Sequence, residues 1–388
     1  MIAVLRQRLW PAKTDTALYD RSLIVVILGL MAFGWVMIAS ASMPEATRLN
    51  GNPFYIVYKE SVFVVGALIL GAVTLSIPMA RWAQYNGWLL VMALLLLAGV
   101  LVVGHSVNGA TRWIRIGPLN LQAAEPAKLF LFAYLAGYLV RRHQEVRENL
   151  VGFLKPLGVF FLMALMLLMQ PDLGTVVVML VTTLGLLFLA GARLWQFVAM
   201  IVVGVSALVL LVVTEPYRMK RVTGFLNPWA DPFGAGYQLT QSLMAFGRGG
   251  LTGQGLGNSI LKMEYLPEAH TDFIMAIVAE ELGFIAIVLL MLVIFWVVLR
   301  ALKIGRHAMA NDRHFEGFFA YAIAIWVAFQ AAVNLGVAAG AFPTKGLTMP
   351  LVSYGGSSLW IMTIALSVLV RIDHEARLAG QQARGGRA

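Results

Sequence analysis

Long apolar stretches separated by polar connections dominate the sequence. A transmembrane helix needs about 20 consecutive, mostly apolar residues, and ten stretches approach that length. They predict spans at about 22–42, 61–79, 88–104, 128–140, 154–169, 174–191, 195–213, 272–299, 317–339 and 349–371. The pattern therefore predicts an all-α polytopic membrane protein with about ten transmembrane helices.

The predicted spans divide the chain into three parts. These are a cytoplasmic N-terminal segment (1–21), a ten-helix transmembrane domain (22–371) and a cytoplasmic C-terminal tail (372–388). Ala39-Ser40-Ala41 is similar to a signal-peptidase site, but the apolar run from Leu23 to Ile38 is long for a signal peptide. We therefore expect the first span to be retained.

Composition and charge agree with a membrane location. The chain is 60% hydrophobic and 12% charged, whereas soluble domains carry about 25% charged residues. With a cytoplasmic N-terminus, 18 of the 29 Lys and Arg residues lie on the cytoplasmic side, as the positive-inside rule requires. The net charge of +10 thus reflects topology, and we expect no nucleic-acid partner. The absence of cysteine excludes disulfides and thiolate metal sites.

Two outer segments depart from the lipid-like pattern. The connection 214–271 is long and contains Asn227-Pro228-Trp229 and a glycine-rich run around 247–257, which predicts ordered turns and a folded periplasmic cap. In the segment 104–127, Arg112 and Arg115 alternate with apolar residues. We expect a short strand-like or interfacial stretch with both guanidinium groups on one side, serving either as a headgroup anchor or as a diphosphate clamp.

Ionisable residues at membrane depth are costly, at about 2.5–3.5 kcal/mol each or more, and are therefore functional candidates. Glu125 and Lys128 share one helical face and can form an ion pair that shapes a polar cavity. Asp172, in Gln170-Pro171-Asp172, is typical of a helix N-cap.

The densest polar cluster is Glu264-Tyr265-Leu266-Pro267-Glu268-Ala269-His270-Thr271-Asp272. Thr271 is a candidate N-cap, which places Asp272 in the first turn of the eighth span. There Asp272 is either a partner of the helix dipole or a catalytic carboxylate. Glu280 and Glu281, two turns further, are expected to be packing or ion-pair partners.

The last outer loop, from Phe342 to Ser358, contains two prolines and several glycines that interrupt an apolar stretch. Broken backbone at membrane depth is tolerated where it lines protein or water. Lys345 is the sole basic residue of this loop, and it suits either a substrate phosphate or a lipid headgroup.

Several long strings resemble the SEDS family (shape, elongation, division and sporulation). They are the block from Pro216 to Phe284, with "GFLNPWADPFGAGYQLTQSLMAFGRGGLTGQGLGNS" and "EYLPEAHTDFIMAIVAEELGF", together with "GATRWIRIG", "QPDLGT" and "PTKGLTMPLVSYGGSS". Within the family, four features resemble the cell-division branch rather than the elongation branch. They are Asn227-Pro228-Trp229, Ala269 before His270, Pro343-Thr344-Lys345-Gly346-Leu347 and Arg371-Ile372-Asp373.

The resemblance implies polymerisation of lipid II into septal glycan strands on the outer face of the inner membrane. It assigns the essential carboxylate, expected to act as the general base, to Asp272, and further functional positions to Glu264 and Lys345. Substrate contacts are also expected from a wider set, which comprises Glu125, Lys128, Arg112, Arg218, Arg221, His270 and Ser353. No cofactor is assigned, although a divalent cation (Mg or Mn) could bridge Asp272 and a diphosphate.

The resemblance also implies partners and a location. The expected partners are the class B penicillin-binding transpeptidase FtsI and the divisome regulators FtsQ, FtsL, FtsB and FtsN, at the division septum. Two other functions stay open at this stage, a lipid II flippase and a non-enzymatic scaffold that recruits the transpeptidase. A flippase should carry polar residues through to its cytoplasmic half, whereas the candidates here cluster on the outer side.

Overall fold

The computed structural model contains the predicted helical bundle. It describes residues 19–107, 110–117, 119–215, 219, 223–234, 236–343 and 346–385. Within these residues, ten long helices correspond to the ten predicted spans, so the fold class is confirmed. They are α2 (Arg21–Asn50), α3 (Tyr55–Ser76), α4 (Met79–Val103), α5 (Ala124–Arg141), α7 (Leu150–Met169), α8 (Leu173–Leu189), α9 (Leu194–Val213), α12 (Ile274–Ala310), α13 (His314–Ala338) and α14 (Gly356–Gly385).

The helices differ in how much lipid they can face. Seven are long and apolar enough to cross a membrane by themselves, and Leu173–Leu189 and Leu194–Ser206 are shorter apolar helices. The remaining helix, α5, lies inside the bundle, where 14 of its 18 residues are buried. Because neighbouring helices surround α5, it can carry Glu125 and Lys128 where a lipid-facing helix could not.

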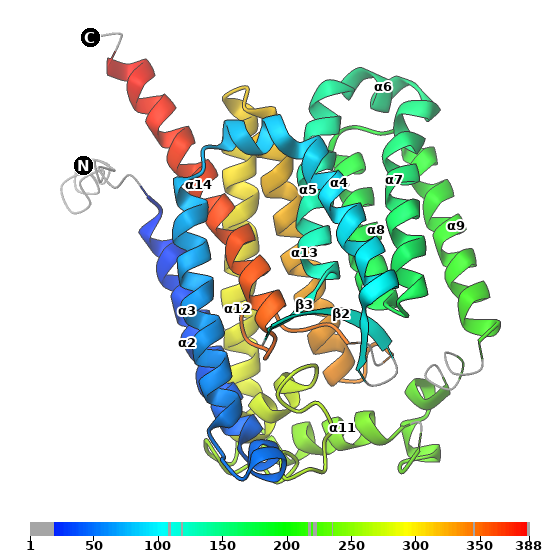
Figure 1. Cartoon of the computed structure of the whole chain (residues 1–388), viewed down its shortest axis with the longest axis vertical. Coiled ribbons are helices and arrows are strands. Elements are labelled where there is room, and N and C mark those ends of the chain that lie inside the picture. Colours follow the sequence, from blue (N-terminus) through cyan, green and yellow to red (C-terminus); the bar gives the residue numbers. More distant parts are fainter. Residues whose placement is uncertain are drawn as a thin grey trace, which may run out of the picture.

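The end of the bundle predicted to be cytoplasmic brings the start of α2 and the end of α14 to the same side (Figure 1). Asp20 caps α2 by accepting from the backbone of Ser22 and Leu23, and the Arg300 side chain of α12 donates to its carboxylate. Burial raises the pKa of Asp20, but the hydrogen bonds from Ser22, Arg300 and Leu23 together hold this pKa below its ordinary value. The short helix α6 (His143–Glu148) joins α5 to α7 at this end.

The opposite end carries the folded elements of the outer segments. A three-stranded antiparallel sheet, in the order β1 (His105–Val107), β2 (Ala110–Ile116) and β3 (Leu119–Gln122), follows α4. The long connection contains the 3-10 turn η1 (Pro228–Ala230) and helix α11 (Tyr237–Gly249), which lies across the end of the bundle (Figure 1). The predictions of a strand-like stretch and a folded cap are therefore confirmed.

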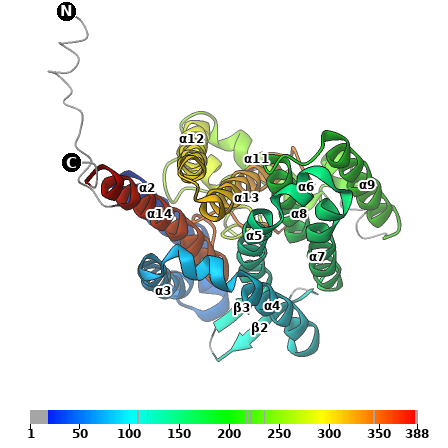
Figure 2. The ribbon, with the colours of Figure 1, turned by 90° about the horizontal axis from the view of Figure 1, so that it is seen from above.

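Both arginines of the predicted strand-like stretch lie in β2. The pairing of β1 with β2 is irregular at Arg112, because His105 pairs with Trp113 while Ser106 pairs with Thr111. Such a bulge interrupts the regular alternation of side chains, so the placement of both guanidinium groups on one side stays a prediction. Seen from the end of the bundle, the sheet lies beside α4 (Figure 2).

Helix α12 is interrupted where the glycine-rich loop reaches it. Gly283 has φ 80° and ψ 178°, which breaks the helix. The backbone N–H groups that follow Gly283 therefore bond outside the helix. Phe284 and Ile285 donate to the carbonyls of Gly250 and Leu251 at 2.9 and 3.2 Å. A Cβ on Gly253 would lie 2.2 Å from the carbonyl oxygen of Glu281, so this contact between two backbones requires glycine.

The tenth helix begins later than the sequence predicts. We expected a span from about 349, but α14 begins at Gly356. The residues before it form turns, in which the Ser353 hydroxyl accepts from the backbone of Met349 at 2.8 Å and Leu351 has φ 61°. This broken backbone packs directly on α2, where a Cβ at Gly34 would lie 2.6 Å from the Leu351 carbonyl oxygen. Protein therefore covers the break, as predicted.

Candidate active site

Asp272 lies at the outer mouth of α12, just before the helix. The helix begins at Ile274, and Phe273 occupies the N-cap position without a side-chain cap. The predicted cap by Thr271 is therefore wrong, because the Thr271 hydroxyl donates to the Glu268 carboxylate at 2.6 Å instead. Asp272 is consequently not in the first turn, although it still lies at the positive end of the helix dipole.

The carboxylate of Asp272 faces the last outer loop. A Cβ built on Gly346 would lie 3.1 Å from Asp272 Oδ2, so the carboxylate sits against the backbone of that glycine. Any side chain at position 346 would have to displace it. Asp272 is half-buried, which leaves it accessible from one side.

Helix α13 holds these two segments together through Asn334. Its side-chain amide donates to the carbonyl oxygen of Asp272 at 3.0 Å and to that of Leu347 at 2.6 Å. The segment before α12 and the loop before α14, about 75 residues apart in sequence, thereby meet at one amide group.

One turn earlier on α13, Gln330 joins the same loop to the buried ion pair of α5. Gln330 Nε2 donates to the carbonyl of Thr348 at 2.9 Å, and its Oε1 accepts from Lys128 Nζ at 3.1 Å. Lys128 Nζ also lies 3.0 Å from Glu125 Oε1 and 4.9 Å from the ring centroid of Trp326. The predicted pairing of Glu125 with Lys128 is thus confirmed, and α13 links it to the Asp272 region.

His270 and Glu264 contact the outer end of α2. His270 is buried, and its Nδ1 lies 3.2 Å from Glu45 Oε2. Its backbone carbonyl accepts from the Tyr354 amide at 2.9 Å, which ties the Asp272 segment to the last loop a second time. Glu264 is half-exposed and pairs with Arg48 at 2.8 Å.

Arg112 and Asp172 meet near the turn between α7 and α8. Arg112 Nε donates to the Gln170 carbonyl at 3.1 Å, and its guanidinium also reaches the Pro171 carbonyl. Asp172 caps α8 by accepting from the Thr175 backbone at 3.2 Å and from its hydroxyl at 2.9 Å. The capping prediction is confirmed, while the phosphate role of Arg112 stays a prediction.

Three predicted substrate residues lie outside the described part of the chain, namely Lys345, Arg218 and Arg221. Ser353 is described, but it is buried and its hydroxyl closes the turn at Met349. Its predicted contact with substrate also stays a prediction.

Glu280 and Glu281 are fully buried and paired, as expected. Glu280 accepts from Arg248 of α11 and from the backbone of Ile260 at 2.9 Å. Glu281 accepts from Lys262 Nζ at 2.7 Å and from the Ser40 hydroxyl of α2 at 2.8 Å. These carboxylates therefore fasten the long connection between α9 and α12 onto α12 and α2.

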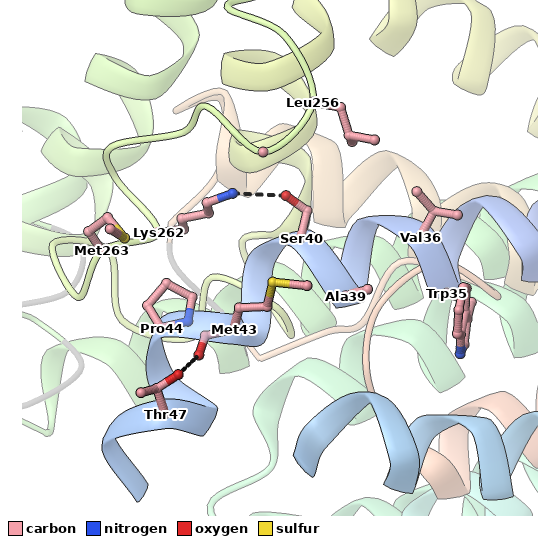
Figure 3. Close-up of a pocket in the computed structure, with 11 residues that line it drawn as sticks. Trp35, Val36, Ala39, Ser40, Met43, Pro44, Thr47, Leu256, Lys262 and Met263 are labelled. Carbon is pink, nitrogen blue, oxygen red and sulfur yellow. Dashed lines mark hydrogen bonds between the residues drawn. The ribbon is translucent and has the colours of Figure 1, made fainter. Parts of the chain in front are cut away.

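A cavity of about 730 Å³ lies beside this cluster, between α2 and the loop 256–263. Figure 3 shows Lys262 and Ser40 hydrogen-bonded to each other at its edge. The rest of the lining is mainly apolar, and it comprises Trp35, Val36, Ala39, Met43, Pro44, Thr47, Leu256, Gly257 and Met263. None of the predicted site residues that the structure describes lines this cavity.

The side chains near Asp272 do not form a metal site by themselves. Across the described residues, no group of three or more His, Cys, Asp or Glu side chains could hold a metal ion. Mg²⁺ is commonly held by one or two carboxylates together with substrate phosphates, so a cation that bridges Asp272 and a diphosphate stays a prediction.

Sequence reasoning did not identify Asn334, Gln330 or Lys262. A usable signal was present for the first two, because they are polar amides spaced i, i+4 in an otherwise apolar helix. Lys262 lies in a loop, and only the fold shows that it is buried against Glu281.

Relatives with similar sequences share one description. The chain is 60% identical over 384 residues to a protein of Aeromonas salmonicida, named as a probable peptidoglycan glycosyltransferase FtsW, and the match covers 99% of this chain and 97% of the relative. A protein of Escherichia coli O6:H1 with the same name is 58% identical over 377 residues, which cover 96% of this chain and 91% of the relative.

Solved structures show the same fold. A chain from a peptidoglycan synthase complex, described as coordinating polymerisation and crosslinking, superposes with a TM-score of 0.74 at 29% identity and covers 95% of this chain and 99% of its own length. The rod shape determining protein RodA of Thermus thermophilus gives a TM-score of 0.68 at 28% identity, covering 93% of this chain and 98% of its own.

A family model described as "cell cycle protein", FTSW_RODA_SPOVE, matches residues 20–378. This match covers most of the chain and includes both the Asp272 segment and the last outer loop. The chain therefore belongs to the FtsW/RodA/SpoVE family of cell cycle proteins, the SEDS family that its sequence motifs resemble.

Proposed function

We propose that this chain is a membrane-embedded peptidoglycan glycosyltransferase that polymerises lipid II into septal glycan, with Asp272 as the general base. The observation that carries the proposal is the identity of about 60% over 99% of the chain to a probable peptidoglycan glycosyltransferase. The accessible carboxylate at the outer mouth of α12 is consistent with that activity.

The proposed step is an inverting transfer in which Asp272 receives a proton. The acceptor sugar hydroxyl attacks the anomeric carbon of the donor and forms the new glycosidic C–O bond. The bond between that carbon and the lipid diphosphate breaks, and the electron pair leaves with the diphosphate. The hydroxyl proton passes to the Asp272 carboxylate, because a base is needed as the nucleophile loses its proton.

Cationic groups must stabilise the departing diphosphate. The candidates are Lys345, a functional position that the resemblance implies, and three arginines that are candidates by their charge. These are Arg218, Arg221 and Arg112, of which Arg112 lies at the outer end near the α7–α8 turn. Lys128 is less suited to direct contact, because its side chain is fully buried against Glu125 and Gln330. The Glu125–Lys128 pair instead contacts Gln330, which in turn donates to the loop at Thr348.

A flippase is disfavoured by the positions of charged residues in the central helices. No Asp, Glu, Lys, Arg or His occurs between Lys128 and Arg141 in α5, between Glu316 and the end of α13, or between Gly356 and Arg371 in α14. A polar substrate crossing the bundle would meet no charged side chain along the middle of these helices. The predicted substrate residues instead lie toward the outer end, where a polymerase needs them.

A crosslinking partner is part of the proposal. The similar solved chain comes from a complex described as coordinating polymerisation and crosslinking, which supports a class B penicillin-binding transpeptidase, FtsI, as the partner. Association with FtsQ, FtsL, FtsB and FtsN, the septal location and the two cytoplasmic termini are proposed with it.

The test is polymerisation of purified lipid II by the purified chain, with and without the transpeptidase. Glycan formed when the transpeptidase's own active site is blocked supports the proposal. A parallel assay in vesicles follows translocation of fluorescent lipid II across the bilayer. Translocation without any polymer would support the flippase, and partner binding with neither activity would support the scaffold; either result rejects the glycosyltransferase.

A further inference from the structure

The two outer segments that meet at the candidate site are both attached to the side chain of Asn334. Its Nδ2 donates to the backbone oxygen of Asp272 at 3.0 Å and to that of Leu347 at 2.6 Å. Asn334 is 1% exposed, so water cannot replace these bonds. The side chain emerges from α13, which is packed inside the bundle.

The chemistry of the amide fixes its orientation. A primary amide has two N–H donors and one carbonyl acceptor, and both donors are used. Its Oδ1 is buried and has no hydrogen-bond partner among the described residues. The reversed orientation would place that oxygen against two carbonyl oxygens, which repel it. Asn334 therefore acts here through its two N–H donors. Its buried carbonyl oxygen lacks a partner among the described residues, which is energetically unfavourable.

The next polar residue on α13 repeats the arrangement. Gln330, one turn away, donates to the carbonyl of Thr348 at 2.9 Å, the residue directly after Leu347. The two amides thus lie on one face of a helix and hold consecutive peptide groups of the last outer loop. Only Asn334 also holds the Asp272 peptide.

We infer that Asn334 is a positioning residue for the Asp272 base, a role that rests on the proposed function. By fixing the Asp272 peptide relative to the loop at Leu347, it sets where the carboxylate lies beside Gly346. Reaction rates depend steeply on such geometry, because small displacements remove the reacting groups from alignment. Asn334 itself touches backbone, so it acts through Asp272.

The test compares Asn334→Ala with Asn86→Ala in the full chain with its transpeptidase. Asn86 is a matched control, since it is 2% exposed and sits on α4 near the cytoplasmic end, where Arg141 donates to it at 3.1 Å. Turnover of lipid II, KM for lipid II and thermal unfolding are measured for both variants.

For Asn334→Ala we expect kcat to fall about 10- to 100-fold through misplacement of the base, with KM within about threefold of wild type because substrate binding is kept. Asn86→Ala should keep wild-type kcat. Asn334→Asp preserves the size of the side chain but removes the two donors at neutral pH, and its kcat should fall at least as far.

Two results would overturn the inference. One is a kcat for Asn334→Ala and Asn334→Asp equal to that of Asn86→Ala. The other is a loss of activity that tracks unfolding in both Asn334 variants, which would make the residue structural only. Failure of the base assignment itself is distinguishable, because it requires Asp272→Asn to remain active whatever the Asn334 variants do.

Discussion

Replacement of Asp272 by asparagine tests the assignment of the base most directly. The substitution keeps the size of the side chain, and Asn334 binds the backbone carbonyl of Asp272 rather than its carboxylate, so the link to α13 survives. An amide cannot take up the acceptor proton, and loss of a general base lowers rates about 10²- to 10⁴-fold. We expect that loss in kcat.

The effect on folding should be small by comparison. Asp272 lies before α12 at the positive end of its dipole, where a carboxylate contributes about 0.3–1 kcal/mol. A loss of that size leaves a stable, partner-binding protein, so the large fall in kcat can be told apart from the small loss of stability. Thermal unfolding measures the stability of the variant, and co-purification measures its binding to the transpeptidase.

The assay is polymerisation of purified lipid II, with product length read on gels and initial rates from labelled substrate. Asp312→Asn supplies a matched control, because it makes the same chemical change on the turn between α12 and α13, where the side chain is 97% exposed. The control should retain wild-type turnover. If Asp272→Asn polymerised within a few-fold of wild type, the assignment would be refuted, and Glu264, half-exposed beside Arg48, would be the next candidate.

Three other predictions follow from the same features. Lys345→Ala should reduce polymerisation while membrane insertion and transpeptidase binding stay near normal; wild-type activity in the lipid II assay would remove its phosphate role. A reporter fused after Ala388 should read as cytoplasmic and one inserted near Asp231 as external, and the reverse at either site contradicts the span count. Lys128→Met should lower the free energy of unfolding by about 3–5 kcal/mol, because it leaves a buried carboxylate unpaired; an unchanged thermal midpoint in detergent would show that the ion pair is not needed for stability.

Much of the architecture was determined by the sequence alone. Lipid offers no hydrogen bonds, so each spanning segment must satisfy its own backbone as a helix, and apolar length by itself located all ten helices. Local chemistry also sufficed for Asp172, whose cap on α8 depends on residues three positions away, and for the Glu125–Lys128 pair on one helical turn.

The tertiary structure decided every feature that depends on contacts between distant segments. The late start of α14 follows from a turn closed by Ser353 and from packing against Gly34, neither of which hydropathy can register. Thr271 does not cap α12, because its hydroxyl donates to the Glu268 carboxylate instead. The role of Asn334 required the fold. It joins Asp272 and Leu347, which α12 and α13 separate along the chain, and both backbone carbonyls meet its side chain only in the folded bundle.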